Sequence, residues 1–245
     1  MTNTKQNYHV LIHQFQNVSH EDYNQFERKK QVLLQLSKAS NKGMAIYDMH
    51  RNEYTFLHWK YESDYPFQKK INCMESLQTL LHPADVEYVY SSKHKALSMI
   101  HKLPADKLKQ HKLIFECRMR NANGTFQRFI HQYMVLELDK DGELWLLILL
   151  LDPVTGRETD TPPRGMMIMD CMTGTMKFSH PETCFTRREV EILQLLAQGN
   201  ESSRIAEILF ISKNTVDNHR RNILSKTQTE NTTQALMYAR IIGVI

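Results

Sequence analysis

The sequence lacks the motifs that usually mark an enzyme or a metalloprotein. Its 245 residues include only eight glycines, and these form neither a glycine-rich phosphate loop nor the sharp turn that holds a catalytic serine. The four cysteines are too scattered for a metal site: they are Cys73, Cys117, Cys171 and Cys184. We therefore expect a protein that is not an enzyme and that has no metal site or cofactor evident from its sequence.

Long apolar segments are also missing. The longest apolar run, Leu144–Leu151, is far too short to span a bilayer, and the polar start of the chain, Met1–Gln6, does not resemble a signal peptide. Scattered cysteines of this kind fit a reducing compartment, so we expect a cytoplasmic protein without membrane contact. A length of 245 residues, a hydrophobic content of 41% and a net charge of +4 predict two folded domains.

The most informative pattern lies at residues 212–226. Ser212 can begin a helix, because its hydroxyl oxygen accepts a hydrogen bond from a backbone N–H of the first turn. With about 3.6 residues per turn, Val216 and Ile223 fall on one narrow apolar face. The opposite face carries hydrogen-bonding side chains, namely Asn214, Asp217, Asn218, Arg221 and Ser225. Asn and Arg fit the edges of adenine and guanine in the major groove, so this pattern predicts a recognition helix.

Helix signals surround this segment. Thr186 and Glu189 have the spacing of a capping box, and Gly199 is placed to end that first helix. A second helix is expected to start near residues 202–203, and the short link 210–212 then leads into the recognition helix. A fourth helix follows, and the expected cap and core residues of these three helices are Asn231, Val190, Leu193, Leu196, Ala197, Ile205, Ala206, Ile208, Leu209, Ala235, Leu236, Tyr238, Ala239 and Ile242.

In this order and without a gap, residues 185–245 resemble the LuxR-type (GerE-like) helix-turn-helix domain of bacterial transcription regulators. The matching positions are Phe185–Glu189, Leu195–Gly199, Ile205–Ala206, Leu209, Ile211–Ser212, Thr215–Val216, His219, Ile223, Lys226, Ala235 and Ile242–Ile245. Two positions depart from the family pattern. Residues 201–204 lack the lysine that usually precedes the Ile-Ala pair, and Asp217 stands where the family often has lysine. Both departures remove expected contacts to DNA.

The resemblance implies a homodimer that binds double-stranded DNA in the major groove, with RNA polymerase as a further partner that the family allows. Together with side-chain chemistry, it assigns base contacts to Arg221, Asn218, Asp217 and Asn214. Phosphate contacts are expected from Lys213, Thr215, Arg220, Lys226, Ser203 and Arg204. The dimer contact, as in the family, is expected from Ala235, Tyr238, Ala239 and Ile242.

Other interpretations of this helix stay open. A polar helix face is often only solvated, and Asp217 could pair with Arg221 one turn on. The charge is modest, since residues 185–245 contain eight Lys or Arg against six Asp or Glu. Because each neutralised phosphate adds only about −0.9 to the salt slope, a monomer should bind weakly and a dimer is needed. An alternative function is a protein-interaction module that keeps the helix-turn-helix fold without sequence-specific DNA binding.

Residues 1–41 are expected to form a helical extension. Apolar residues between positions 8 and 18 recur at helical spacing, and Ser19 can cap a second helix. The apolar side chains of this second helix are Phe26, Val32, Leu33 and Leu36. His9 and His13 lie one turn apart, but no third metal ligand is evident. The second helix is expected either to cover a sheet or to pack between protomers.

From residue 42 to residue 153 the pattern changes to one of strands. Short strands are expected at 45–47 and 54–57, a helix from Ala84 to Ile100, and longer strands at 113–119, 126–138 and 143–151. Asn123-Gly124 predicts the turn of a hairpin. The last strand is apolar on both faces, which predicts an interior position in the sheet.

This order of strands and helices resembles a PAS-type sensor domain, with its best local matches at His82–Asp85 and Glu116–Gly124. PAS domains often form a pocket, but the sequence identifies no ligand. Two groups of residues keep more than one interpretation. Met44, Met49, Met119 and Met134 could line a pocket or fill the core, and His82, His94 and His131 could bind haem or be ordinary surface or core residues.

The expected fold class is an α+β PAS-like domain, an antiparallel sheet with helices, followed by an all-α helix-turn-helix domain of four helices. Prolines and polar residues mark the connection between them, and Thr173-Gly174 predicts a small hairpin within it. The expected domains are a helical extension at 1–41, a PAS-like sensor and dimerisation domain at 42–153, a linker at 154–181 and the DNA-binding domain at 182–245. The first domain is expected to control the second.

Overall fold

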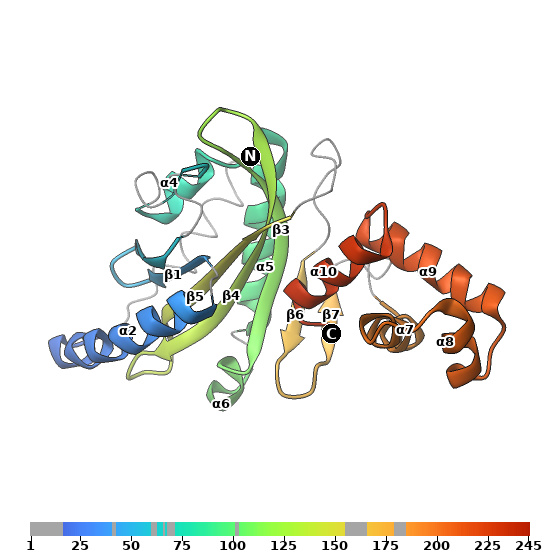
Figure 1. Cartoon of the computed structure of the whole chain (residues 1–245). Helices are drawn as coiled ribbons and strands as arrows, with labels where there is room; N and C mark the ends of the chain where they lie inside the picture. Colours follow the sequence, from blue (N-terminus) through green and yellow to red (C-terminus); the bar gives the residue numbers. More distant parts are fainter. Residues whose placement is uncertain are drawn as a thin grey trace. The chain divides into compact units, whose positions relative to one another are not determined.

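The computed structural model describes residues 17–40, 43–59, 63–65, 67, 72–100, 103–154, 166–178 and 185–245. The chain divides into an N-terminal unit, residues 1–153 with 162–177, and a C-terminal unit, residues 154–161 with 178–245 (Figure 1). The predicted first helix, with His9 and His13, lies outside the described residues, as does most of the proline-rich connection.

The N-terminal unit combines one antiparallel sheet with helices, as predicted for a PAS-like fold. Its elements are α2 (His20–Ser40), β1 (Gly43–Asp48), β2 (Glu53–His58), α4 (Met74–Gln78), the 3-10 helix η1 (Pro83–Asp85), α5 (Val86–Ile100), α6 (Ala105–Leu108), β3 (His111–Arg120), β4 (Phe126–Leu138), β5 (Leu144–Pro153), β6 (Met167–Asp170) and β7 (Met176–Phe178).

The described strands form a sheet in the order β2-β1-β5-β4-β3-β6-β7. β5 pairs with both β1 and β4, so the prediction that this apolar strand lies inside the sheet is confirmed. β3 and β4 form the predicted hairpin, in which Cys117 is opposite Phe129 and Phe115 is opposite His131. Gly124 in its turn has a φ of +90°, a conformation that a residue with a Cβ rarely adopts.

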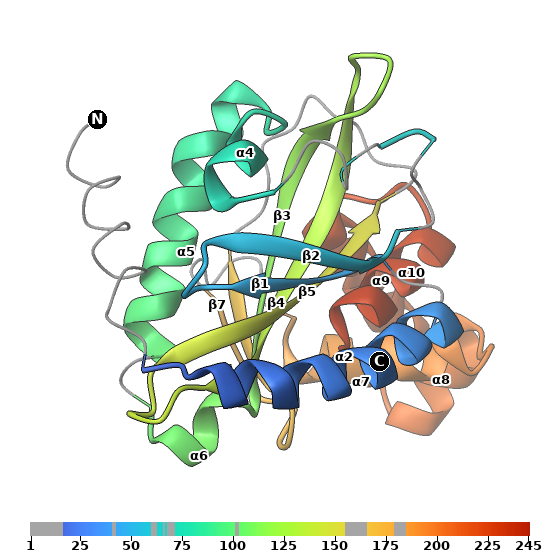
Figure 2. The same ribbon diagram turned by 90° about the vertical axis from the view of Figure 1, so that its left-hand side faces the viewer.

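Helices cover the two faces of the sheet. α5 packs over one face, where Phe115, Tyr133 and Leu147 belong to the main core of the unit. α2 lies along the other face, with Phe26 packed against Trp145 in a second core, so this helix covers the sheet, which is one of the two alternatives expected for it (Figure 2). Two other apolar side chains of this helix, Val32 and Leu36, are each 56% exposed.

The small hairpin predicted around Thr173-Gly174 exists, but it is not an isolated part of a linker. β6 pairs antiparallel with β3, with His111 opposite Asp170, so the hairpin extends the sheet of the N-terminal unit. Asp170 shapes the turn, because its Oδ1 accepts hydrogen bonds from the backbone N–H groups of Met172 and Thr173. The sequence shows the hairpin but not the strand with which it pairs.

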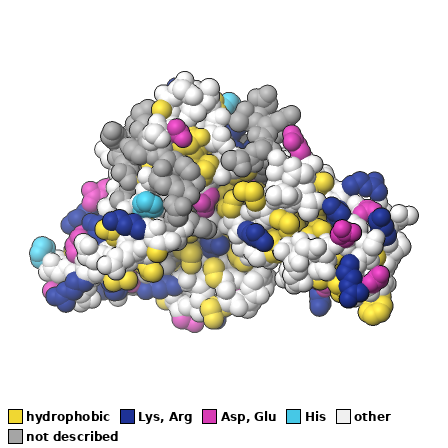
Figure 3. Space-filling view, viewed as in Figure 1, with side chains coloured by type: hydrophobic (Ala, Val, Ile, Leu, Met, Phe, Trp, Pro, Cys, Tyr) yellow, Lys and Arg dark blue, Asp and Glu magenta, His cyan; other side chains and the backbone are white. Residues whose placement is uncertain are grey.

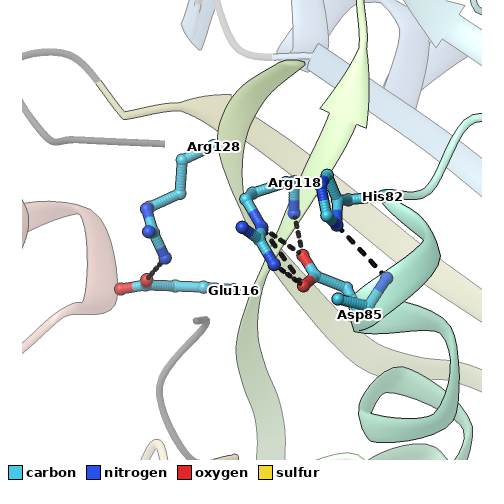
Figure 4. Close-up of polar contacts among 6 residues, drawn as sticks. His82, Asp85, Glu116, Arg118 and Arg128 are labelled. Atoms are coloured by element: carbon cyan, nitrogen blue, oxygen red, sulfur yellow. Dashed lines mark hydrogen bonds and ion pairs between the residues drawn. The ribbon is translucent and has the colours of Figure 1, made fainter. Parts of the chain in front are cut away.

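Two buried ion pairs occupy β3 and its neighbours (Figure 4). Asp85, at the end of η1, is fully buried and accepts hydrogen bonds from the backbone N–H of Arg118 at 2.7 Å and from its Nη2 at 2.5 Å. Arg128 on β4 donates to Glu116 on β3 at 3.1 Å.

Pro83 and Asp85 belong to a 3-10 turn, and α5 begins at Val86 rather than at Ala84 as predicted.

The C-terminal unit is the four-helix fold that the sequence predicts. It consists of α7 (Arg187–Ala197), α8 (Ser202–Leu209), α9 (Lys213–Thr227) and α10 (Thr232–Ile242). Fully buried Ile192, Leu193, Ile205 and Val216 form the centre between the first three helices. The prediction that Ile208 belongs to the core is wrong, because its side chain is 37% exposed.

Candidate nucleic-acid interface

Side-chain caps fix where the helices of the C-terminal unit begin. Thr186 and Glu189 form the predicted capping box, and Ser212 accepts a hydrogen bond from the backbone N–H of Thr215 at the start of α9. Asn231 caps α10 in the same way. The turn between α8 and α9 is tight because Phe210 adopts a left-handed conformation with a φ of 53°. α9 therefore starts at a defined residue directly after α8.

The predicted base-reading side chains lie on the outside of α9. Asn214, Asn218 and Arg221 are exposed, while Val216 and Ile223 on the opposite side are buried, as the helical spacing predicts. Arg221 Nη2 donates to Asn218 Oδ1, so the two side chains lie together. This arrangement presents a guanidinium and two amides along one outward face of a capped helix.

Asp217 lies on α9 directly before Asn218, and its side chain is partly buried. The structure gives Arg221 a hydrogen bond to Asn218 instead of the pairing with Asp217 that the solvated-face interpretation proposed. Asp217, Lys213, Arg220 and Ser203 line a hollow between the start of α8 and the side of α9, with about 760 Å³ of empty space that is open to solvent. Both anionic and cationic groups are therefore within reach of a molecule that enters this hollow.

The predicted phosphate-binding residues fall into two groups. Lys213, Ser203 and Arg204 are exposed and Thr215 is partly exposed, all on the solvent side of α8 and α9. Arg204 forms an ion pair with Glu207 at 2.7 Å. On the face of this unit that Figure 3 shows, Lys and Arg side chains stand among acidic ones, so the positive charge on that face is not continuous.

Arg220 and Lys226 are engaged inside the unit. Arg220 donates to Ser202 Oγ at 2.6 Å and to Thr232 Oγ1 at 2.9 Å, and so joins α8, α9 and α10. Lys226 Nζ lies 2.7 Å from an oxygen of buried Glu189 on α7. Sequence reasoning missed these structural roles, although Glu189 in a capping box was a signal that an acidic side chain would turn inward.

The side chains predicted to form the dimer contact are buried in the single chain. Ala235, Tyr238, Ala239 and Ile242 are between 0% and 8% exposed, on a helix that packs against α7 and α9. These side chains therefore contribute to packing within the single chain, and the dimer contact assigned to them stays a prediction. Met237, on another side of α10, is 49% exposed and is the large apolar side chain that this helix presents to solvent.

A cavity lies between α5 and the sheet of the N-terminal unit. It has about 540 Å³ of empty space, part of which is open to solvent, and its lining is almost entirely apolar or aromatic. Met49 and Met134 line it as the sequence allowed, whereas Met119 lies fully buried in the core. Lys93 from α5 also lines it, with its Nζ 5.0 Å from the centre of the Tyr133 ring. The arrangement offers a partly open, mainly apolar site with two basic side chains, Lys93 and His111, in its lining.

The histidines considered as haem ligands have other contacts. His82 Nδ1 accepts a hydrogen bond from the backbone N–H of Ala84, and His131 is fully buried beside Cys117. His94 is partly exposed on α5. Among the described residues, no three His, Cys, Asp or Glu side chains gather around a common metal position. Within the same residues, no helix has the length and apolarity that crossing a bilayer requires.

Comparison with known proteins gives matches to the C-terminal unit. Residues 183–239 match the model of the bacterial regulatory proteins of the luxR family. Regulatory protein SdiA of Escherichia coli is 46% identical over 65 residues, or 26% of this chain and 27% of that protein. The quorum-sensing regulator RhlR of Pseudomonas aeruginosa is 46% identical over 70 residues, or 29% of each. The chain thus covers less than a third of the length of these relatives.

Among solved structures, the match to the phage VqmA–DPO complex covers 89% of this chain and 89% of the VqmA chain, with 14% sequence identity and a TM-score of 0.34. The response regulator ChrA of a heme-sensing two-component system is 42% identical over 27% of this chain and 33% of its own, with a TM-score of 0.26.

Proposed function

We propose that this chain, whose residues 183–239 match the model of the luxR family of bacterial regulatory proteins, is a DNA-binding transcription regulator and not an enzyme. One observation carries the proposal: α9 is a capped helix directly after a tight turn, and its outward face presents Asn214, Asn218 and Arg221. A helix of this width and polarity fits the major groove of DNA. The proposed partner is double-stranded DNA.

Base reading is assigned to Arg221 and Asn218, with Asn214 and Asp217 beside them. A guanidinium donates two hydrogen bonds to O6 and N7 of guanine, and an amide both donates to and accepts from adenine. Arg221 donates a hydrogen bond to the side-chain oxygen of Asn218, so the two groups lie next to each other on the outer face of α9. Asp217 can accept a hydrogen bond from the N4 amine of cytosine, so its replacement of a common lysine alters the preferred sequence.

Phosphate binding is assigned to the outward group, Lys213, Thr215, Ser203 and Arg204. Arg220 and Lys226 can still add to the positive field, but their bonds to Ser202 and Glu189 support a second role, which is to hold α9 against the other helices. Contacts to phosphates orient a recognition helix without reading sequence. Affinity and register therefore depend on different residues from those that select the bases.

We place the function in a homodimer, because a single unit offers few cations to DNA. The proposed contact is α10, which carries the residues predicted from the sequence and also presents Met237, a side chain that is 49% exposed. Two copies of α9 would then read two half-sites about one helical turn apart. The N-terminal cavity between α5 and the sheet is the proposed site at which a small molecule controls this activity.

Genome-wide immunoprecipitation with the Arg221→Ala variant beside the parent tests the proposal. We expect the sequence-selective sites to disappear, since losing one bidentate base contact costs about 1–3 kcal/mol of discrimination. Arg187→Ala is the matched control, because this arginine is 96% exposed on α7 and its loss removes the same charge. Unchanged sites in the Arg221 variant would mean that the bases are read elsewhere.

The second candidate is a protein-interaction module without sequence-specific DNA binding, favoured by Asp217 and by the serine-containing start of α8. Titration of labelled duplex of random sequence at two salt concentrations separates the two functions. A regulator loses affinity steeply as salt rises, because counterions compete for the phosphates. A module without DNA affinity gives no binding at either concentration.

A further inference from the structure

Three side chains with soft donor atoms meet inside the N-terminal unit. Cys117 Sγ lies 3.0 Å from His131 Nε2, and Met119 Sδ lies 3.2 Å from the same nitrogen. All three residues are 0% exposed. Their common position follows from the sheet, since Cys117 and Met119 lie two residues apart on the same face of β3 and His131 lies on adjacent β4. One imidazole nitrogen thus faces two sulfur atoms.

The surroundings hold this group in place. The ring of His131 stacks on Phe115, with ring centres 5.2 Å apart and an angle of 18° between their planes. A neutral imidazole has one nitrogen with a lone pair that can bind a metal ion, and Nε2 is the nitrogen that faces the two sulfur atoms.

We propose that Cys117, Met119 and His131 bind one copper(I) ion. Thiolate and thioether sulfurs select copper(I), and imidazole also binds copper. Charge distinguishes copper(I) from zinc, because one thiolate and one monovalent cation form a neutral group, whereas a divalent cation would leave a buried positive charge that is costly to desolvate. On binding, the Cys117 thiol loses its proton to solvent and forms the Cu–S bond, so one proton is released for each ion.

The geometry requires a small adjustment. With metal–nitrogen and metal–sulfur bonds of about 2.0 and 2.3 Å, a nitrogen and a sulfur on a trigonal ion lie about 3.7 Å apart. The sulfurs of Cys117 and Met119 must therefore move away from Nε2 by roughly 0.5–0.7 Å, which a flexible methionine side chain allows. The cavity beside α5 is lined by Leu113 and Tyr133 from the same two strands but by none of the three donor residues, so the space for the ion comes from the movement of the two sulfur-bearing side chains.

Competition between the reduced full-length chain and a coloured copper(I) chelator, under anaerobic conditions, tests this site. We expect one tightly held copper(I) for each chain and an X-ray absorption spectrum with both sulfur and nitrogen neighbours. Met119→Leu keeps the volume of the core and should weaken binding by roughly tenfold or more, since even outer-shell changes have such effects. Cys117→Ser should abolish tight binding.

Cys171→Ser is the matched control, because Cys171 is exposed and distant in sequence from the site. It should bind copper(I) as the parent does. The proposal is overturned if the parent does not compete with the chelator, if Met119→Leu binds as tightly as the parent, or if Cys171→Ser removes the ion. Circular dichroism of each variant verifies that the sheet is folded, and the Met119 variant provides the test if Cys117→Ser does not fold.

Discussion

Lys93 combines burial with a position at the edge of the cavity. Burial lowers the pKa of its amine from 10.5 to about 8. Below about pH 8 the amine is charged in both the folded and the unfolded chain. The full free-energy cost of burying this charge then lowers the stability of the fold. As the pH rises from about 8 to 10.5, the folded chain releases the proton first and the destabilisation disappears.

The Lys93→Met variant is therefore expected to be more stable than the parent at about pH 7, by up to roughly 3 kcal/mol. The gain should shrink towards zero at about pH 10.5, because the parent then buries a neutral amine. Urea unfolding followed by the fluorescence of Trp59 and Trp145, both in the N-terminal unit, measures the difference. Equal gains at both pH values would contradict a charged Lys93 and indicate better packing alone.

The backbone conformation of Phe210 determines how this residue affects the stability of the C-terminal unit. It ends α8 with a φ of 53°, and its side chain is 95% exposed. A residue with a Cβ loses about 1–2 kcal/mol in this conformation, and the exposed ring makes little packing contact that could offset it.

We expect Phe210→Gly to stabilise the C-terminal unit by about 1 kcal/mol, because glycine adopts positive φ without a steric cost. Hydrogen exchange of the α9 amides measures this change. Glu207→Gly is the control on the same helix, where glycine in a regular turn should destabilise by a similar amount. A loss of protection in both variants would show that the Phe210 ring supports the fold.

At the scale of elements, η1 is attached to β3 by the ion pair between Asp85 and Arg118. Both side chains are buried, and the carboxylate accepts bonds from the backbone and the guanidinium of the same residue (Figure 4). The beginning of α5 is thereby held at the edge of the sheet. A change in this pair should affect the helix that forms one wall of the cavity.

Asp85→Asn is expected to lower the unfolding free energy of the N-terminal unit by about 3–5 kcal/mol, since it leaves a buried guanidinium without its counter-charge. Tryptophan fluorescence during urea unfolding measures the loss. Asp106→Asn, at an exposed position on α6, should change stability by less than about 0.5 kcal/mol. A similar small effect at Asp85 would mean that water or another group compensates for the lost charge.

Much of the element order could be predicted from the sequence, because it depends on local signals. Thr186, Ser212 and Asn231 are caps whose effect reaches only the next turn, and Asn123-Gly124 determines its own hairpin. The failures involve partners far along the chain. The pairing of β6 with β3, the exposure of Ile208 and the contact of Lys226 with Glu189 depend on which surfaces meet, and periodicity within one segment does not contain that information.

The candidate interface was predictable to the same extent. Exposed Asn214, Asn218 and Arg221 follow from the helical period once the cap at Ser212 sets its phase. The division of the cations into outward and inward groups was not predictable, because Arg220 reaches two other helices and its partner Thr232 lies 12 residues away.

At the scale of the whole molecule, DNA affinity should depend on salt in a way that separates these cations. Removing one phosphate contact makes the slope of log affinity against log salt less steep by about 0.9, or about 1.8 when both chains of a dimer lose it. We expect this change for Lys213→Ala. Arg187→Ala on α7 should leave the slope unchanged.

Fluorescence anisotropy with a labelled duplex at several salt concentrations measures these slopes for the full chain. Lys226→Ala gives a distinct expectation: the slope stays close to that of the parent while the unit loses stability, because its lysine neutralises buried Glu189. A slope unchanged in Lys213→Ala would remove this lysine from the interface.

The hydrogen bonds of Arg220 to Ser202 and Thr232 have a practical meaning for redesign. These hydrogen bonds connect α9 to α8 and α10 on the side of α9 that packs against the other helices, away from its outward face. Residues on that surface can then be exchanged as a set while the scaffold keeps its angle. A library randomised at 214, 217, 218 and 221 should consequently yield folded variants with new operator preferences, whereas a library that includes 220 should yield many that do not fold.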